Sequence, residues 1–206
     1  MSTQGPAPRP RPVLLAAGRS TRFRGGHKLL APLRGEPVVV HALRALLEAG
    51  LDPPLVVLGG ESVAVEAALQ EAFPRVAFEA VVNGRYAEGL GTSLALAARL
   101  CGERPLLVAL GDMPCLSAAD HRAVVAALDP SDPLAVARGS EGGVAGHPVA
   151  MGRAWPALLA GLGGDRGAGA LLREAAITFV PLDPATQIDV DTREALARAE
   201  ASLGQR

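Results

Sequence analysis

The chain has 206 residues, a formal net charge of −1 and 49 % hydrophobic residues, which fit one globular domain with a full core and exclude an intrinsically disordered chain. Because basic residues are not in excess, nucleic acid is not expected as the main partner. Two cysteines make no disulfide framework and match no metal motif, and no apolar run reaches the roughly 18–20 residues of a membrane span. We therefore expect a cytoplasmic protein with no membrane partner.

The first 12 residues carry prolines at positions 6, 8, 10 and 12 and lack the apolar centre of a signal peptide. This composition predicts an extended, flexible tail over residues 1–12. No break in composition and no internal repeat follows it. A single domain over residues 13–206 is therefore expected.

Strand-like and helix-like segments alternate through that domain. Strands are predicted at Val13–Ala17, Leu55–Leu58, Val76–Val81, Leu106–Leu110, Leu134–Ala137 and Thr178–Pro181. Helices are predicted at Val38–Ala49, Val63–Ala72, Ser93–Leu100, Ala118–Leu128, Gly167–Ala175 and Arg193–Leu203. Thr92 and Ser117 are the expected caps of two of these helices. The alternation and the continuous apolar strands predict an α/β fold with a mostly parallel open sheet and helices on both faces.

A loop rich in glycine and cations follows the first strand. Glycine and serine backbone groups near Gly18 and Ser20 can approach an anion closely, and Arg22 and Lys28 add a bidentate fork and a point charge. The spacing fits neither a Walker loop nor the dinucleotide fingerprint. The pattern indicates a phosphate-binding loop, with a solvated charged loop as the alternative.

Asp112 directly follows the apolar run Leu106–Leu110. Ligands bind beyond the carboxyl ends of strands in such sheets, so this loop and the Gly18–Lys28 loop are expected to face one crevice. A carboxylate there can hold Mg²⁺ together with water and phosphate. The alternative is that Asp112 caps a turn or a helix.

Asp189 and Asp191 alternate with apolar residues, which places both carboxylates on one side of an extended segment. Two carboxylates on one face repel each other unless a cation lies beside them. A second metal ligand is therefore expected here. Alternatively, Asp191 or Thr192 only caps the final helix.

Three further segments contain glycines at points where a ligand could approach the backbone. They are Asn83–Leu94, with Gly89 and Ser93; Gly142–Val149, with Gly146, His147 and Pro148; and Gly164–Leu172, with Arg166. Without other information, the first is equally well a loop with a helix cap. His147 either donates to a phosphate or bonds backbone within a turn.

In chain order the motifs read Leu-Ala-Ala-Gly-x-Ser-x-Arg-Phe with a following Lys, Gly-Leu-Gly-Thr-Ser-Leu, Gly-Asp-Met-Pro, Gly-His-Pro and Asp-Thr. From Val13 to Leu203 the chain resembles the cytidylyl-transferring branch of the MobA-like nucleotidyltransferase family, which acts on molybdenum cofactor. The resemblance implies a Rossmann-like nucleotidyltransferase fold of the nucleotide-diphospho-sugar transferase type. It also implies Mg²⁺-dependent transfer of CMP from CTP to the phosphate of molybdopterin, with release of pyrophosphate.

The resemblance also implies the roles of individual residues. Arg22, Lys28 and Asp112 would be the catalytic residues. Asp112 and Asp191 would bind the metal, since Asp191 matches the Asp-Thr position. The nucleotide would contact Leu15, Ala16, Ala17, Gly18, Ser20, Arg22, Lys28, Asn83, Gly89, Ser93 and Asp112. The acceptor would contact Gly146, His147, Pro148 and Arg166.

Several alternatives remain open at this point. Ala17 matches the cytidylyl branch, whereas the guanylyl branch reads Leu-Ala-Gly-Gly, so CTP is expected over GTP. The acceptor could instead be another phosphorylated small molecule. The same fold could also hold a nicotinamide nucleotide in an oxidoreductase similar to those that act on a nicotine-derived pigment. A non-catalytic chaperone that delivers cofactor to a molybdenum hydroxylase is a further possibility.

Overall fold

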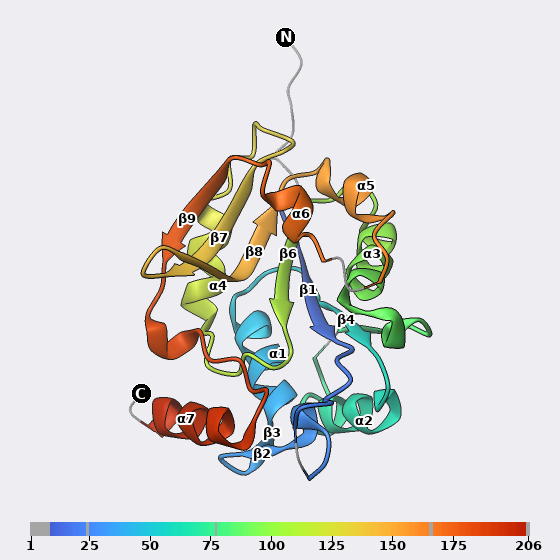
Figure 1. Ribbon diagram of the computed structural model, residues 1–206, viewed down its shortest axis with the longest axis vertical. Coiled ribbons are helices and arrows are strands. Elements are labelled where there is room, and N and C mark those ends of the chain that lie inside the picture. The colour runs from blue at the N-terminus through green and yellow to red at the C-terminus, as the bar shows by residue number, and fades with distance from the viewer. Residues whose placement is uncertain (1–8, 24, 77, 165–166, 205–206) are drawn as a thin grey trace.

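The computed structural model describes residues 9–23, 25–76, 78–164 and 167–204. Within them a seven-stranded sheet has the order β5-β4-β1-β6-β8-β7-β9, with helices on both faces (Figure 1). Its strands are β1 Arg11–Ala16, β4 Leu55–Leu58, β5 Glu79–Val82, β6 Leu106–Leu110, β7 Val136–Glu141, β8 Val144–Met151 and β9 Ile177–Pro181. Strand β8 is antiparallel to β6 and β7, and the other neighbouring pairs are parallel. The expected α/β class and mostly parallel sheet are confirmed.

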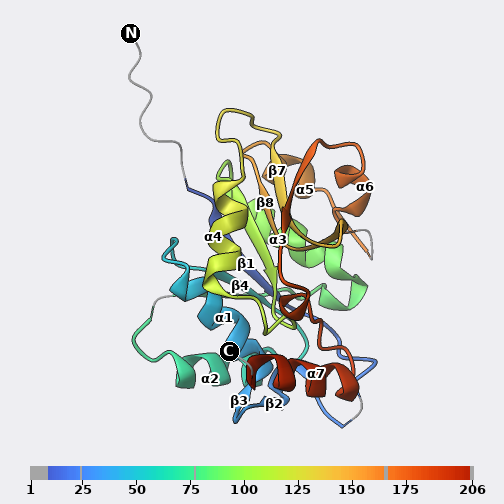
Figure 2. The same ribbon diagram turned by 90° about the vertical axis from the view of Figure 1, so that its left-hand side faces the viewer.

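The helices divide between the two faces of the sheet. Helices α1 Val38–Glu48, α2 Ser62–Ala72 and α4 Ala118–Ala126 pack on one face with Leu14 and Ala16 of β1. Helices α3 Leu90–Cys101, α5 Trp155–Leu159 and α6 Gly169–Leu172 pack on the other face with Leu15 and Ala17. The final helix, α7 Arg193–Gly204, lies beyond one end of the sheet beside the small hairpin β2 Pro32–Leu33 and β3 Glu36–Pro37 (Figure 2).

Strands β1 and β6 are neighbours in the centre of the sheet. They run parallel, and Leu15 is registered with Leu110. Both strands are almost wholly buried because helices cover both faces, which explains their continuous apolar sequences. Their carboxyl ends lie level, so the loop after β1 and the loop after β6 open at the same edge, as the sequence predicted.

Most predicted elements are present, with different limits. Strand β1 begins at Arg11 instead of residue 13, because Arg11 pairs with Leu106 and forms an ion pair with Glu79. Residues 11 and 12 therefore belong to the sheet and not to the predicted tail, and residues 1–8 lie outside the described residues. Strand β5 covers residues 79–82 instead of 76–81, and β7 covers 136–141 instead of 134–137. The predicted helix over residues 167–175 is confined to 169–172.

Strand β8 was not predicted, because its Gly-His-Pro sequence is typical of a turn. In the structure Pro148 lies within β8, next to an irregular part of the β7–β8 pairing, where the register shifts between Arg138 and Ser140. Such an irregularity accommodates a proline, which has no backbone N–H to donate. The Gly146–Pro148 segment is therefore part of the sheet.

The predicted helix caps had different outcomes. Ser117 forms the expected capping box with Asp120 at the start of α4. Thr92 is not a cap, because α3 begins at Leu90 after Gly89, whose φ of 125° suits glycine. Instead, the Thr92 hydroxyl donates to the Gly89 carbonyl at 2.8 Å. In the described residues no helix is long and apolar enough to cross a membrane.

Candidate functional site

A pocket of about 350 Å³ opens at the carboxyl ends of β1 and β6, a size suited to a small-molecule ligand. The loop after β1, the start of α3 and the segment before α7 all contribute to its walls. The lining residues are Leu15, Ala17, Gly18, Arg19, Ser20, Thr21, Arg22, Phe23, Lys28, Tyr86, Gly89, Leu90, Ser93, Leu110, Asp112, Asp189 and Asp191. Four segments that are far apart in the sequence, including the end of β6 with Asp112, therefore share one crevice.

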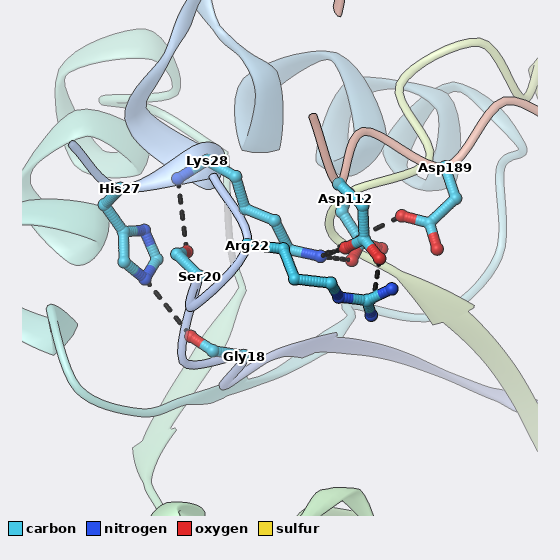
Figure 3. A network of polar contacts seen from close by, with 8 residues as sticks. Gly18, Ser20, Arg22, His27, Lys28, Asp112 and Asp189 are labelled. Carbon is cyan, nitrogen blue, oxygen red and sulfur yellow. Dashed lines mark hydrogen bonds and ion pairs between the residues drawn. The ribbon is translucent and has the colours of Figure 1, made fainter. Parts of the chain in front are cut away.

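The loop from Gly18 to Lys28 is held in shape by its own hydrogen bonds. Ser20 has a φ of 52°, and its carbonyl accepts from the backbone N–H of Phe23 at 3.1 Å. The Ser20 hydroxyl accepts from the backbone N–H of Lys28 at 3.2 Å, and His27 Nε2 donates to the Gly18 carbonyl at 3.2 Å (Figure 3). These contacts hold the beginning of the loop, at Gly18 and Ser20, against its end, at His27 and Lys28, next to the pocket.

Helix α7 holds the tip of the same loop. Arg193 Nη2 donates to the Gly25 carbonyl at 3.3 Å, and the Arg193 guanidinium lies 5.0 Å from the centroid of the Phe23 ring. Phe23 is buried against Val190 and Leu196. The segment that carries Asp189 and Asp191 is therefore held against the Gly18–Lys28 loop.

Lys28 lies among three carboxylates in the pocket. Its Nζ forms an ion pair with Asp112, lies 2.6 Å from Asp191 Oδ1 and 3.9 Å from Asp189 Oδ1 (Figure 3). The second oxygen of Asp191 lies 2.6 Å from Arg22 Nη2. Arg22 and Lys28, the residues expected to hold phosphate, thus contact the acidic cluster here.

The cluster changes the protonation equilibria of its members. Burial lowers the pKa of Lys28, but the charge of Asp112, the hydrogen bonds to Asp112 and Asp191 and the charge of Asp189 together outweigh it, so the net change is upward. The pKa of Asp189 is raised to about 6, mainly by burial and also by the charges of Asp112 and Asp191, while Lys28 opposes the rise. Lys28 therefore stays charged at neutral pH.

The acidic cluster fits a divalent cation. One oxygen from each of Asp112, Asp189 and Asp191 lies within 4.8 Å of the others. Asp112 Oδ1 is buried and makes no hydrogen bond to the described residues, so it has a lone pair free for a metal. Carboxylate oxygens are the ligands that Mg²⁺ and Mn²⁺ prefer. Thr192 caps α7 by accepting from the Ala195 N–H at 3.2 Å, which leaves the Asp191 carboxylate facing the pocket.

The wall opposite the Gly18–Lys28 loop is built on α3. Asn83 is buried, and its Nδ2 donates to the hydroxyls of Thr92 and Ser93, each at 2.9 Å. Only Ser93 of these three residues lines the pocket, next to Gly89 and Tyr86. Asn83 therefore positions Ser93 instead of lining the pocket itself.

The other predicted site residues are placed as follows. Ala16 points away from the pocket into the core on the α1 side. Gly146, His147 and Pro148 lie on β8, beside the pocket but not among its lining residues. Arg166 lies outside the described residues. The sequence did not single out Tyr86, Leu90 or Leu110, because their only signal is their place shortly before α3, at its first residue and at the end of β6.

Residues 12–178 match the MobA-like NTP transferase domain. The chain belongs to this family. Among curated proteins, Bifunctional protein GlmU from Anaeromyxobacter sp. (strain K) is 36 % identical over 117 residues, which are 56 % of this chain and 24 % of that protein. The chain thus spans about a quarter of the length of the curated family relatives that it matches.

Solved structures extend this family likeness to the whole fold. Rv0371c from Mycobacterium tuberculosis H37Rv has a TM-score of 0.80 and 28 % identity, covering 96 % of this chain and 100 % of that one. The structure of Rv0371C in complex with manganese gives a TM-score of 0.75 at 28 % identity, over 94 % and 99 % of the two chains. A nucleotidyl transferase from Methanothermobacter thermautotroptrophicus, at 24 % identity and a TM-score of 0.80, covers 96 % and 99 % and shares the fold.

Proposed function

We propose that this protein is a Mg²⁺-dependent nucleotidyltransferase that transfers CMP from CTP to the phosphate of a molybdopterin-type acceptor. The observation that carries the proposal is the meeting of the Gly18–Lys28 loop with Asp112, Asp189 and Asp191 in one pocket. A phosphate-binding loop alone serves many ligands. A loop with cations beside a metal-binding carboxylate cluster supports transfer at a phosphorus atom.

In this proposal the protein works by positioning and by neutralising charge. The loop backbone and Arg22 bind the triphosphate, and Lys28 turns from the carboxylates towards the leaving pyrophosphate. Asp112 and Asp191, with Asp189 beside them, hold Mg²⁺. That ion, when bound, neutralises charge that develops on the phosphates. An acceptor phosphate is already ionised near pH 7, so no general base is needed.

Two observations support a nucleotide, and cytosine in particular. Ser93 accepts from Asn83 and keeps its own proton, which it can donate to a base carbonyl. Ala17, the residue in which the two family branches differ, lines the pocket and is 7 % exposed. Its methyl group narrows the space in which a purine would have to fit.

Pyrophosphate release tests the proposal directly. Purified protein is incubated with Mg²⁺, molybdenum cofactor and CTP, GTP or ATP in turn. We expect release that requires both CTP and the cofactor and is abolished by EDTA. Absence of release with every nucleotide would overturn the proposal.

A thermal shift assay separates the other classes of function, since a ligand stabilises the folded state by the logarithm of its concentration over Kd. We expect CTP to raise the unfolding temperature more with Mg²⁺ than without it. A rise with NADPH alone would point to an oxidoreductase. A rise with cofactor alone, without a response to nucleotide, would point to a carrier.

A further inference from the structure

Arg138 of β7 lies on the same side of the sheet as the nucleotide pocket. It is registered with Val149 of β8, which is registered with Val108 of β6. Registered neighbours point to the same face, and Val149 and Val108 pack with Leu15 and Ala17 in one core cluster. The pocket floor and Arg138 therefore belong to one continuous face of the sheet.

The charge of Arg138 has no counter-ion in the described part of the chain. Its Nε and Nη2 both donate to one acceptor, the Gly146 carbonyl, at 3.1 and 2.9 Å. The residue is half-buried, and burial lowers the pKa of its guanidinium. A half-buried cation is costly unless an anion pairs with it. The double contact with Gly146 fixes the guanidinium and leaves Nη1 available.

The surroundings of Arg138 connect it with the acidic cluster. The pKa of His147 is lowered to about 4, mainly by burial and also by the charge of Arg138, while the charge of Asp112 opposes the change. The His147 ring is thus within electrostatic reach of both residues. Its Nδ1 is buried and has no partner in the described residues. Gln187 holds the His147 backbone from both sides, with its Oε1 at 3.1 Å and its Nε2 at 2.8 Å.

An exposed aromatic side chain lies next to Arg138 on the same face. Phe179 of β9 is registered with Arg138, and 47 % of it is exposed. The described helices of this face, α3, α5 and α6, do not lie in front of β7 and β9 (Figure 1). The Phe179 ring is thus exposed next to Arg138, whose charge has no partner in the described residues.

We propose that Arg138 binds an anionic oxygen group of the acceptor, a phosphate or a carboxylate, while Phe179 packs against a planar ring of the same molecule. This inference rests on the proposed function, since it places the acceptor on the β8–β7–β9 side of the pocket. It adds two residues that the motifs do not include. Charge complementarity selects the anion, and the flat exposed ring favours a planar partner.

Two fluorescent probes test the proposal without any turnover. Pterin is a flat heterocycle, and 6-carboxypterin adds one carboxylate to it. Fluorescence anisotropy gives the Kd of each probe. We expect the wild-type protein to bind 6-carboxypterin about 10–100-fold more tightly than pterin. This ratio of Kd values corresponds to the free energy of one hydrogen bond to a charged group. Inorganic phosphate should compete with 6-carboxypterin if the subsite also takes phosphate.

Variants test whether Arg138 causes the preference for 6-carboxypterin and whether Phe179 contacts the pterin ring. Arg138→Met should abolish the preference for 6-carboxypterin, and Arg138→Lys, which keeps the charge without the fork, should retain part of it. Phe179→Ala should weaken both probes by the same factor. Arg122→Met is the matched control, because Arg122 also donates to a backbone carbonyl but lies on α4, on the other face. Thermal unfolding confirms that each variant is folded.

The proposal is overturned if the wild-type protein binds neither probe, if it binds both equally, or if both Arg138 variants keep the full preference. These outcomes are independent of pyrophosphate release from CTP. A protein that releases pyrophosphate but shows no preference for 6-carboxypterin would contradict only the role of Arg138. A protein with the preference but no release would contradict only the proposed transfer.

Discussion

Lys28 and Asp191 are 163 positions apart in the chain, yet Lys28 Nζ donates a hydrogen bond to Asp191 Oδ1 at 2.6 Å. The same ammonium group also forms an ion pair with Asp112. One cation thus neutralises carboxylates from two distant segments. A divalent metal at these carboxylates would carry out the same neutralisation, and Lys28 would then be free to contact phosphate.

Replacement of Lys28 should make the stability of the protein depend on metal. Lys28→Met leaves three carboxylates facing one another, and we expect a loss of about 1–3 kcal/mol in the free energy of unfolding in EDTA. MnCl₂ should then raise the unfolding temperature more in Lys28→Met than in the wild-type protein. Lys28→Arg, which keeps the charge, is the control. An equal rise in unfolding temperature with MnCl₂ in both proteins would contradict the inference that Lys28 and a metal neutralise the same carboxylates.

Asp112→Asn should lower nucleotidyl transfer by roughly 10²–10³-fold, the usual effect of losing one charged contact to a transition state. The substitution keeps the shape of the side chain, so the unfolding temperature should change little. Initial rates of pyrophosphate release measure the effect. Asp129→Asn, which alters an exposed aspartate in a loop after α4, should keep the wild-type rate. Full activity in Asp112→Asn would refute the metal assignment.

Ala17→Gly should weaken the preference for CTP over GTP. Removal of one methyl group from the pocket wall gives a purine more room, and a change of this size alters discrimination by about 10-fold. The ratio of kcat/KM for CTP to kcat/KM for GTP is the quantity to measure. An unchanged ratio would show that Ala17 does not contact the base.

His121 should make the protein less stable in mild acid. Burial lowers the pKa of His121 in the folded protein from 6.5 to about 4. Between these values the unfolded chain takes up a proton and the folded chain does not, so stability is complete above pH 6.5 and falls as the pH drops towards 4. The slope is at most about 1.4 kcal/mol per pH unit for one histidine.

Urea unfolding at several pH values tests this slope. His121→Leu should flatten the dependence between pH 6.5 and 4, although His147, whose pKa is lowered in the same way, keeps part of it. Parallel curves for the wild-type protein and His121→Leu would show that His121 titrates alike in both states.

The strands that the sequence predicted best are those buried on both faces. Leu55–Leu58 and Leu106–Leu110 have the predicted limits, because a continuous apolar run between two glycine- or proline-containing turns has one stable place in such a sheet. Strand β8 was missed for the opposite reason. Its Gly-His-Pro sequence is locally typical of a turn, and only pairing with β6 and β7 makes it a strand.

The sequence by itself determined the loop rich in glycine and cations after β1, the acidic residues after β6 and before α7, and the edge of the sheet where they would meet. Motif order and strand polarity contain this information. The tertiary structure alone decided that Lys28 faces Asp112 and Asp191, that Asn83 supports Ser93, and that Arg138 shares a face with the pocket. These contacts depend on which strands are neighbours and on their register, and neither is encoded within any one segment.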